Sequence, residues 1–143
     1  MIVYAESSAV LCWLLEERGA AAVARVLAGA SRVVSSTLTH VECARAIVRG
    51  EAIGQFTPSA AKELSHIFAV AEATWERLEL RDGVIARARK PFPVEPIRAL
   101  DAIHLASAAV ANAAFGPIAM LSLDERVRAN ATALGLTVLP ANP

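Results

Sequence analysis

The sequence predicts an α/β protein in which helices cover both faces of a parallel sheet, giving three layers (α/β/α). Five short apolar runs are predicted as strands, at residues 2–5, 32–35, 75–80, 118–121 and 137–139. Helical patterns separate these runs along the chain. Because the runs are apolar without polar alternation, they are typical of strands that are buried on both faces, as in a parallel sheet.

Seven segments have the apolar spacing that predicts helices. They cover residues 8–17, 20–30, 38–49, 58–73, 83–89, 100–112 and 125–134. Thr57-Pro58 supplies a cap followed by proline at the first helical position. Asp82 can cap the next helix, and Gly135 ends the last one. With 143 residues and no repeat or linker, the chain is predicted to form a single domain over residues 1–143.

Composition argues against some classes of protein. Lys and Arg number 14, as do Asp and Glu, so the formal net charge is +0, and an RNA partner would need locally placed cations. Cys12 and Cys43 lie in apolar helical patterns, which favours buried thiols in a reducing compartment. The uncharged stretch 102–123 is broken by Gly116-Pro117, which favours a buried helix and strand over a membrane span. No signal peptide is indicated, so we expect a cytoplasmic protein.

Four carboxylates occupy similar places in the predicted fold. Glu6 and Asp124 follow strands, Asp101 lies near a helix start, and Glu42 lies one turn into the helix after the second strand. The carboxyl ends of parallel strands share one edge, so these acids are expected to converge there. Their mutual repulsion and all-oxygen chemistry favour a hard divalent ion such as Mg²⁺ or Mn²⁺. Glu6, Asp101 and Asp124 can each equally serve as a favourable charge at a helix N-terminus, whereas Glu42 is flanked by apolar residues and is harder to explain in that way.

Four segments carry a resemblance to a known family. VYAESSAV, SSTLTHVECARAI, ALDAIHLASA and LSLDERVRANATALGLTVL occur in this order over almost the whole chain. Together they resemble PIN-domain proteins, specifically the VapC toxins of type II toxin–antitoxin pairs. The resemblance implies a PIN-like fold with a five-stranded parallel sheet, and a Mg²⁺- or Mn²⁺-dependent endoribonuclease. It also implies an RNA substrate, a homodimer, and a VapB-like antitoxin bound in a groove between the early helices.

The resemblance also implies a set of site residues. The catalytic and metal-binding acids are Glu6, Glu42, Asp101 and Asp124, with the hydroxyls of Ser7 and Ser122 as support. Asp101 and Glu6 would hold the principal ion, and the other two acids would complete or orient its shell. Water bound to the ion would attack the phosphorus of an RNA phosphodiester.

Glu6 departs from the family pattern, which commonly has aspartate at this place. The longer side chain has three options: it can bend to reach the ion directly, bind it through water, or leave a weakened site. Because AESSAV keeps the small residues that allow a tight turn from strand to helix, we favour Glu6 as a direct ligand.

Several basic residues and histidines near the acids have two interpretations. Arg98 and Arg126 are placed to contact RNA phosphates, or they are solvated charges at helix ends. His104, three residues after Asp101, is expected to be a buried core histidine rather than a ligand. His40 is assigned no role.

Two functions remain open on the sequence. The first is a metal-dependent ribonuclease toxin. The alternative is a catalytically weak or silent PIN-like module that binds an antitoxin or RNA without cleavage, with the acids serving as helix caps. A haloacid-dehalogenase-like hydrolase would need two aspartates after the first strand, and a Rossmann-type nucleotide binder would need a glycine-rich loop there. AESSA supplies neither.

Overall fold

The computed structural model describes residues 1–142 and contains a five-stranded, fully parallel sheet. The strands are β1 (Ile2–Ala5), β2 (Arg32–Ser36), β3 (Glu76–Leu78), β4 (Ile118–Leu121) and β5 (Thr137–Leu139). Their order in the sheet is β3-β2-β1-β4-β5. All five predicted strands are present, and β3 is shorter than predicted. The central strands β1 and β4 are almost fully buried, as the uninterrupted apolar runs indicated.

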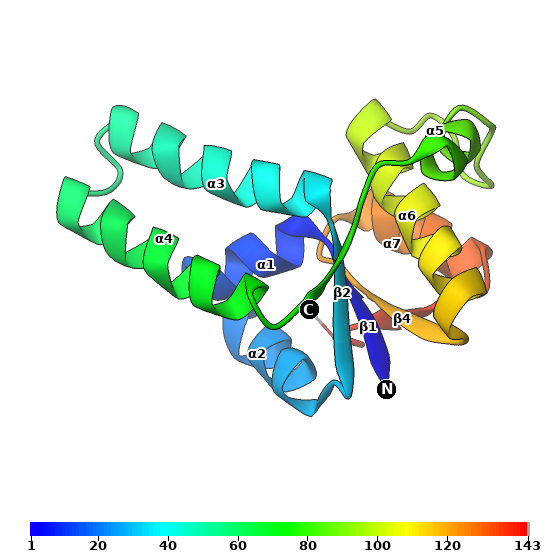
Figure 1. Cartoon of the computed structure of the whole chain (residues 1–143), viewed down its shortest axis with the longest axis horizontal. Coiled ribbons are helices and arrows are strands. Elements are labelled where there is room, and N and C mark those ends of the chain that lie inside the picture. Colours follow the sequence, from blue (N-terminus) through cyan, green and yellow to red (C-terminus); the bar gives the residue numbers. More distant parts are fainter. Residues whose placement is uncertain (143) are drawn as a thin grey trace.

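Seven helices cover the two faces of this sheet, so the predicted three-layer architecture is confirmed (Figure 1). The helices are α1 (Ser7–Leu14), α2 (Ala20–Gly29), α3 (Thr37–Ala52), α4 (Pro58–Glu72), α5 (Asp82–Ala88), α6 (Ala99–Phe115) and α7 (Glu125–Ala133). Helices α1 to α4 lie on one face and α5 to α7 on the other. In Figure 1, α3 and α4 form an antiparallel pair that extends beyond the sheet.

The core is divided into two parts by the sheet. Tyr4 and Met120 point from β1 and β4 toward α6, where they pack with Leu105. On the opposite face, Ala5 of β1 packs with Val10 of α1. Cys12 and Cys43 are buried, unbridged thiols within the described chain, as predicted. Across residues 1–142, no helix is long and apolar enough to span a membrane.

Helix ends agree with the sequence signals in two places and differ in two others. Thr57 caps α4 by accepting from the backbone N–H of Ala60 at 3.2 Å, and Gly135 follows α7 at φ +80°, as predicted. The prediction that Asp82 caps α5 is wrong, because Arg81 is the N-cap and Asp82 is the first helical residue. Its charge still lies at the favourable end of the helix dipole.

Helix α1 ends at Leu14, three residues earlier than predicted. Glu16 adopts the left-handed conformation at φ 54°, and the Glu17 N–H donates to the carbonyl of Cys12 at 3.0 Å. This is the hydrogen-bonding pattern that ends many helices, normally with glycine at the left-handed position. Because Glu16 is not a usual residue there, the sequence carried no stop signal at this point.

His40 has a definite structural role, although the sequence assigned it none. Its Nε2 lies 2.8 Å from the hydroxyl of Ser35 on β2, and its Nδ1 pairs with the carboxylate of Glu72 on α4. The side chain therefore ties the first turns of α3 to the sheet and to α4. These contacts fix the part of α3 that carries Glu42.

Candidate active site

The sheet order places the first and last acids on neighbouring strands. β2 and β3 lie on one side of β1 in the sheet, and β4 and β5 lie on the other side. The strand order therefore reverses between β1 and β4. Ligands of open α/β sheets bind at the carboxyl ends of strands at such a point. Glu6 directly follows β1, and its N–H donates to the carbonyl of Leu121, the last residue of β4, at 3.0 Å. Asp124 lies three residues after Leu121, in the loop that follows β4.

Glu6 is both the N-cap of α1 and the centre of a cluster of serine hydroxyls. The residue is 4% exposed. Oε1 accepts from the Ser7 hydroxyl at 2.7 Å and from the Ser8 N–H at 3.0 Å. Oε2 accepts from the Ser122 hydroxyl at 2.8 Å and from the Ser8 hydroxyl. These four donors fill the acceptor positions of an ionised carboxylate. An ion would therefore compete with a serine hydroxyl for Glu6.

Ser8 is a site residue that the sequence analysis missed. Its hydroxyl oxygen accepts from the backbone N–H groups of Leu123 and Asp124 at 2.9 and 3.2 Å. Ser8 thereby joins the start of α1 to the loop between β4 and α7. The only signal in the sequence is a second hydroxyl beside Ser7, which does not indicate which of the two reaches across the sheet.

Asp101 carries the clearest unbalanced charge of the site. It lies in the first turn of α6, and its buried Oδ2 has no hydrogen-bond partner among the described residues. Burial and the negative charges of Asp124 and Glu6 raise the pKa of Asp101 above its ordinary value, against the opposing charge of Arg98. A cation at Oδ2 would balance this charge.

Asp124 and Glu42 complete the predicted set of acids. Asp124 is the N-cap of α7, and its Oδ1 accepts from the N–H groups of Arg126 and Val127 at 2.9 and 3.0 Å. Glu42 accepts from Nε2 of His104 at 2.6 Å, and the same nitrogen lies 3.9 Å from Oε1 of Glu6. Burial alone would raise the pKa of Glu42, but the hydrogen bond and charge of His104 outweigh it and lower that pKa.

The four acids are grouped at one edge without forming a preassembled ion cage. Within residues 1–142, no three Asp, Glu, His or Cys side chains are arranged tightly enough to hold a metal ion. The donor chemistry nevertheless fits a hard divalent cation, because the acids supply only oxygen ligands. Oδ2 of Asp101 is buried and has no hydrogen-bond partner among the described residues, so no described donor balances its charge.

The comparisons with known proteins agree with this geometry. The family model described as PIN domain matches residues 3–133. Ribonuclease VapC35 from two strains of Mycobacterium tuberculosis is 33% identical over 108 residues, which cover 76% of this chain and 72% of that protein. This chain is a PIN-domain protein of the VapC type.

A solved structure shows the same fold. One chain of VapBC2 from Rickettsia felis, a complex bound to a DNA fragment from its promoter, superposes with a TM-score of 0.65 at 10% identity. The match covers 96% of this chain and 97% of that chain. The five-stranded parallel sheet that the resemblance to VapC proteins implied is present in this chain.

Arg98 and Arg126, the arginines beside the acids, interact with these acids in different ways. Both Arg98 and Arg126 are exposed at the N-terminal ends of helices in this PIN-domain protein. Arg98 is close enough for its charge to lower the pKa of Asp101, against the larger effect of burial. The backbone N–H of Arg126, rather than its guanidinium, donates to Asp124. Both guanidinium groups are thus accessible to a phosphate near the acids.

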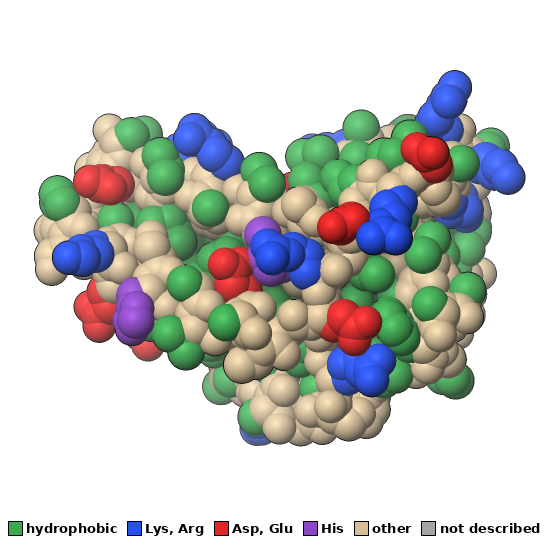
Figure 2. Space-filling model, in the orientation of Figure 1, with side chains coloured by type: hydrophobic (Ala, Val, Ile, Leu, Met, Phe, Trp, Pro, Cys, Tyr) green, Lys and Arg blue, Asp and Glu red, His purple; other side chains and the backbone are tan. Residues whose placement is uncertain are grey.

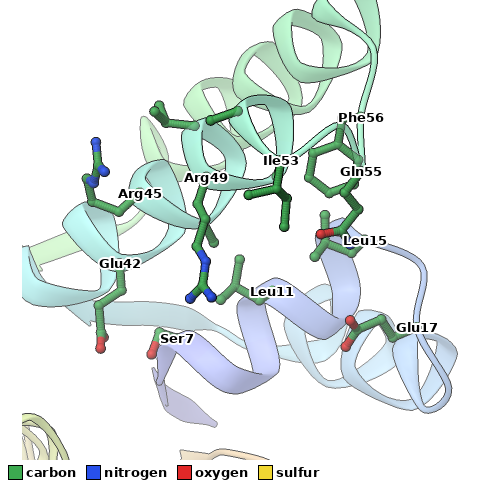
Figure 3. A pocket seen from close by; sticks show the side chains of 14 residues that line it. Ser7, Leu11, Leu15, Glu17, Glu42, Arg45, Arg49, Ile53, Gln55 and Phe56 are labelled. Carbon is green, nitrogen blue, oxygen red and sulfur yellow. The ribbon is translucent and has the colours of Figure 1, made fainter.

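A groove of about 750 Å³ leads away from the acids of this VapC-type protein, between α1 and α3 (Figure 3). Glu42 and Ser7 face each other at its inner end. Leu11 and Ile53 line it further along, and the Arg49 side chain points from α3 toward Leu11. The groove therefore combines an acidic inner end with an apolar wall and two cations, Arg45 and Arg49.

Proposed function

We propose that this PIN-domain protein is a metal-dependent endoribonuclease that hydrolyses RNA phosphodiester bonds as the toxin of a toxin–antitoxin pair. The observation that carries the proposal is the buried, unpartnered Oδ2 of Asp101, whose charge is raised in energy by Asp124 and Glu6. Ion pairing would relieve that repulsion. The family membership and the ribonuclease named among its relatives support the same reaction class.

Each acid of the site has its own role in this reaction. Asp101 and Glu6 would hold the principal ion, and Glu42 and Asp124 would complete or orient its shell. When bound, Mg²⁺ or Mn²⁺ activates water and neutralises charge on the phosphate oxygens. The serine hydroxyls on Glu6 fix that carboxylate at the end of β1.

The arginines supply the positive charge that the balanced composition does not. Figure 2 shows blue and red side chains interspersed on this face of the molecule, without a continuous basic field. Binding of RNA therefore depends on local contacts, for which Arg98 and Arg126 are the candidates beside the acids. Their contacts would position the backbone and carry no direct sequence information.

Sequencing RNA 5′ ends after induction of the wild type and of Asp101→Ala tests the function. The wild type is expected to produce new 5′ ends at discrete positions, and the variant is expected to produce none of them, because it lacks the principal ligand. Identical profiles would refute the assignment. If neither protein produced new 5′ ends, the alternative of a catalytically silent PIN-like module that binds an antitoxin or RNA would be favoured.

We further propose that a VapB-like antitoxin occupies the groove between α1 and α3. The solved structure with the same fold is a VapBC complex by its description, which supports a partner of this class. The apolar wall at Leu11 and Ile53 fits an amphipathic peptide segment, and Arg49 fits an acidic side chain on it. A cytoplasmic homodimer is proposed as the free state.

Charge reversal at Arg49 is expected to weaken binding of the VapB-like antitoxin at least about tenfold. Arg49→Glu places a negative charge in the groove, where it repels the acidic residue that the wild-type arginine attracts. Lys62→Glu is the matched control, since Lys62 is an exposed cation on α4 outside the groove. Surface plasmon resonance with immobilised antitoxin measures both. Equal weakening by the two variants would remove Arg49 from the interface.

A further inference from the structure

Three side chains from three separate elements form a continuous hydrogen-bonded chain behind the acids. The hydroxyl of Tyr4 on β1 lies 3.0 Å from Nδ1 of His104 on α6. Nε2 of His104 lies 2.6 Å from Oε2 of Glu42 on α3. Tyr4 is 0% exposed and His104 is 1% exposed, so water does not compete for these contacts.

The chemistry of the three groups fixes the direction of the chain. The ionised carboxylate of Glu42 can only accept, so Nε2 of His104 must carry a proton. In the neutral ring, Nδ1 is then an acceptor, and the Tyr4 hydroxyl donates to it. The buried phenol of Tyr4 is the donor that faces this nitrogen, at 3.0 Å. In the neutral ring, the Tyr4 hydroxyl therefore complements the tautomer that Glu42 requires, and a protonated ring also donates from Nε2 to Glu42.

We propose that His104 is a positioning residue that orients the Glu42 carboxylate for the metal site, with the Tyr4 hydroxyl holding the ring in place through Nδ1. This inference rests on the proposed function, because it takes Glu42 as part of the ion's shell. The orientation is toward the other acids, since the nitrogen that binds Glu42 also lies 3.9 Å from Oε1 of Glu6.

The contact also links the two helices that carry acids. His104 lies one helical turn after Asp101 on α6, whereas Glu42 lies on α3. The hydrogen bond therefore holds Glu42 in a fixed relation to Asp101. Glu42 is only half-buried and has three rotatable side-chain bonds, so without His104 it would sample many orientations. Loss of comparable supporting contacts lowers metal affinity about 10- to 100-fold.

Two amide variants at His104 test positioning separately from packing. His104→Gln ends in a nitrogen near the place of Nε2, so it can still donate to Glu42. His104→Asn ends near the place of Nδ1 and does not reach Glu42. By isothermal titration with Mn²⁺, we expect the glutamine variant to bind within about threefold of wild type and the asparagine variant at least about tenfold more weakly. Thermal melts of both variants report folding.

The outcomes separate this inference from the proposed function. If the wild type and His104→Asn bind Mn²⁺ equally, positioning by His104 is refuted while the metal site stands. If the wild type itself does not bind Mn²⁺, the proposed function is refuted, and with it the role of Glu42 as a ligand. Equal weakening of the two amide variants, with equal loss of thermal stability, would assign His104 to packing alone and overturn the inference.

A tautomer measurement in the absence of metal gives an independent readout. In a ¹⁵N–¹H spectrum of the histidine rings, wild-type His104 is expected to show a protonated Nε2 and an unprotonated Nδ1. Tyr4→Phe keeps the packing of the ring and removes the hydroxyl donor, so we expect the Nδ1 resonance to shift while Nε2, which donates to Glu42, stays protonated. A wild-type ring protonated only at Nδ1 would overturn the inference, and so would a spectrum that Tyr4→Phe leaves unchanged.

Discussion

Replacing Asp101 with asparagine is expected to abolish Mn²⁺ binding and to reduce RNA cleavage at least about 100-fold, with no loss of thermal stability. The variant removes the anionic ligand whose Oδ2 is buried without a partner. It also removes the repulsion that Asp101 shares with Asp124 and Glu6, so the melting temperature should stay constant or rise. Isothermal titration, cleavage of labelled RNA and a thermal melt measure the three effects.

Asp82→Asn provides the matched control for this experiment. Asp82 also lies in the first turn of a helix, but it is exposed on α5, outside the cluster of acids. We expect Asp82→Asn to leave Mn²⁺ affinity and cleavage unchanged. If Asp101→Asn kept both activities, or lost them only together with its fold, Asp101 would be a helix-end charge without a metal role.

The pH dependence of this stability difference follows from the direction of the pKa shift. The pKa of Asp101 is raised in the folded state, so the folded chain binds this proton more tightly than the unfolded chain. Asp101 therefore costs stability as the pH rises from the ordinary aspartate pKa to the raised value, and the cost is absent in stronger acid. Asparagine does not titrate. The difference in melting temperature between variant and wild type should be largest near neutral pH and vanish in acid.

The fold was predictable because its signals are local. The strands at residues 2–5, 118–121 and 137–139 match β1, β4 and β5, since short apolar runs between helical patterns admit few other assignments. The end of α1 was not predictable. It depends on Glu16 adopting a left-handed conformation. Glycine is the usual residue in that conformation, and it does not occupy this position, so the sequence does not indicate the helix end.

The positions of the acids in the candidate site could be predicted from the sequence, but the contacts between them could not. Glu6 and Asp124 follow strands, and the carboxyl ends of parallel strands share one edge, so their sequence positions were enough to place both acids there. The contact of His104 with Glu42 joins residues 62 positions apart, and no local pattern reports it. His104 is buried, as predicted, but its polar partner is an acid of the site. Tertiary packing alone brings α6 against α3.

The extra methylene of Glu6 explains how this carboxylate can cap α1 and also reach across to β4. The side chain turns back to accept from the Ser8 N–H, while Oε2 meets the Ser122 hydroxyl beyond β4. Aspartate is an equally good N-cap residue, but it is one methylene shorter. Glu6→Asp should therefore keep the cap and lose the contact with Ser122. The loss would free one acceptor position of the carboxylate for an ion.

Glu6→Gln and Glu6→Asp are consequently expected to differ in both stability and metal affinity. Glutamine keeps one acceptor oxygen but turns an NH₂ group toward two of the four donors. The two lost hydrogen bonds outweigh the relief of repulsion with Asp101, so we expect a net loss of about 2 kcal/mol and a melting temperature about 7 °C lower. Mn²⁺ affinity should fall at least about tenfold, because a ligand charge is lost. Glu6→Asp should bind Mn²⁺ as well as wild type or better and lose about 1 kcal/mol. Titration calorimetry and thermal melts of the two variants distinguish the cases. Unchanged Mn²⁺ affinity in both variants would make Glu6 a structural cap. An equal loss of Mn²⁺ affinity in both would show that the longer side chain itself is required at the ion.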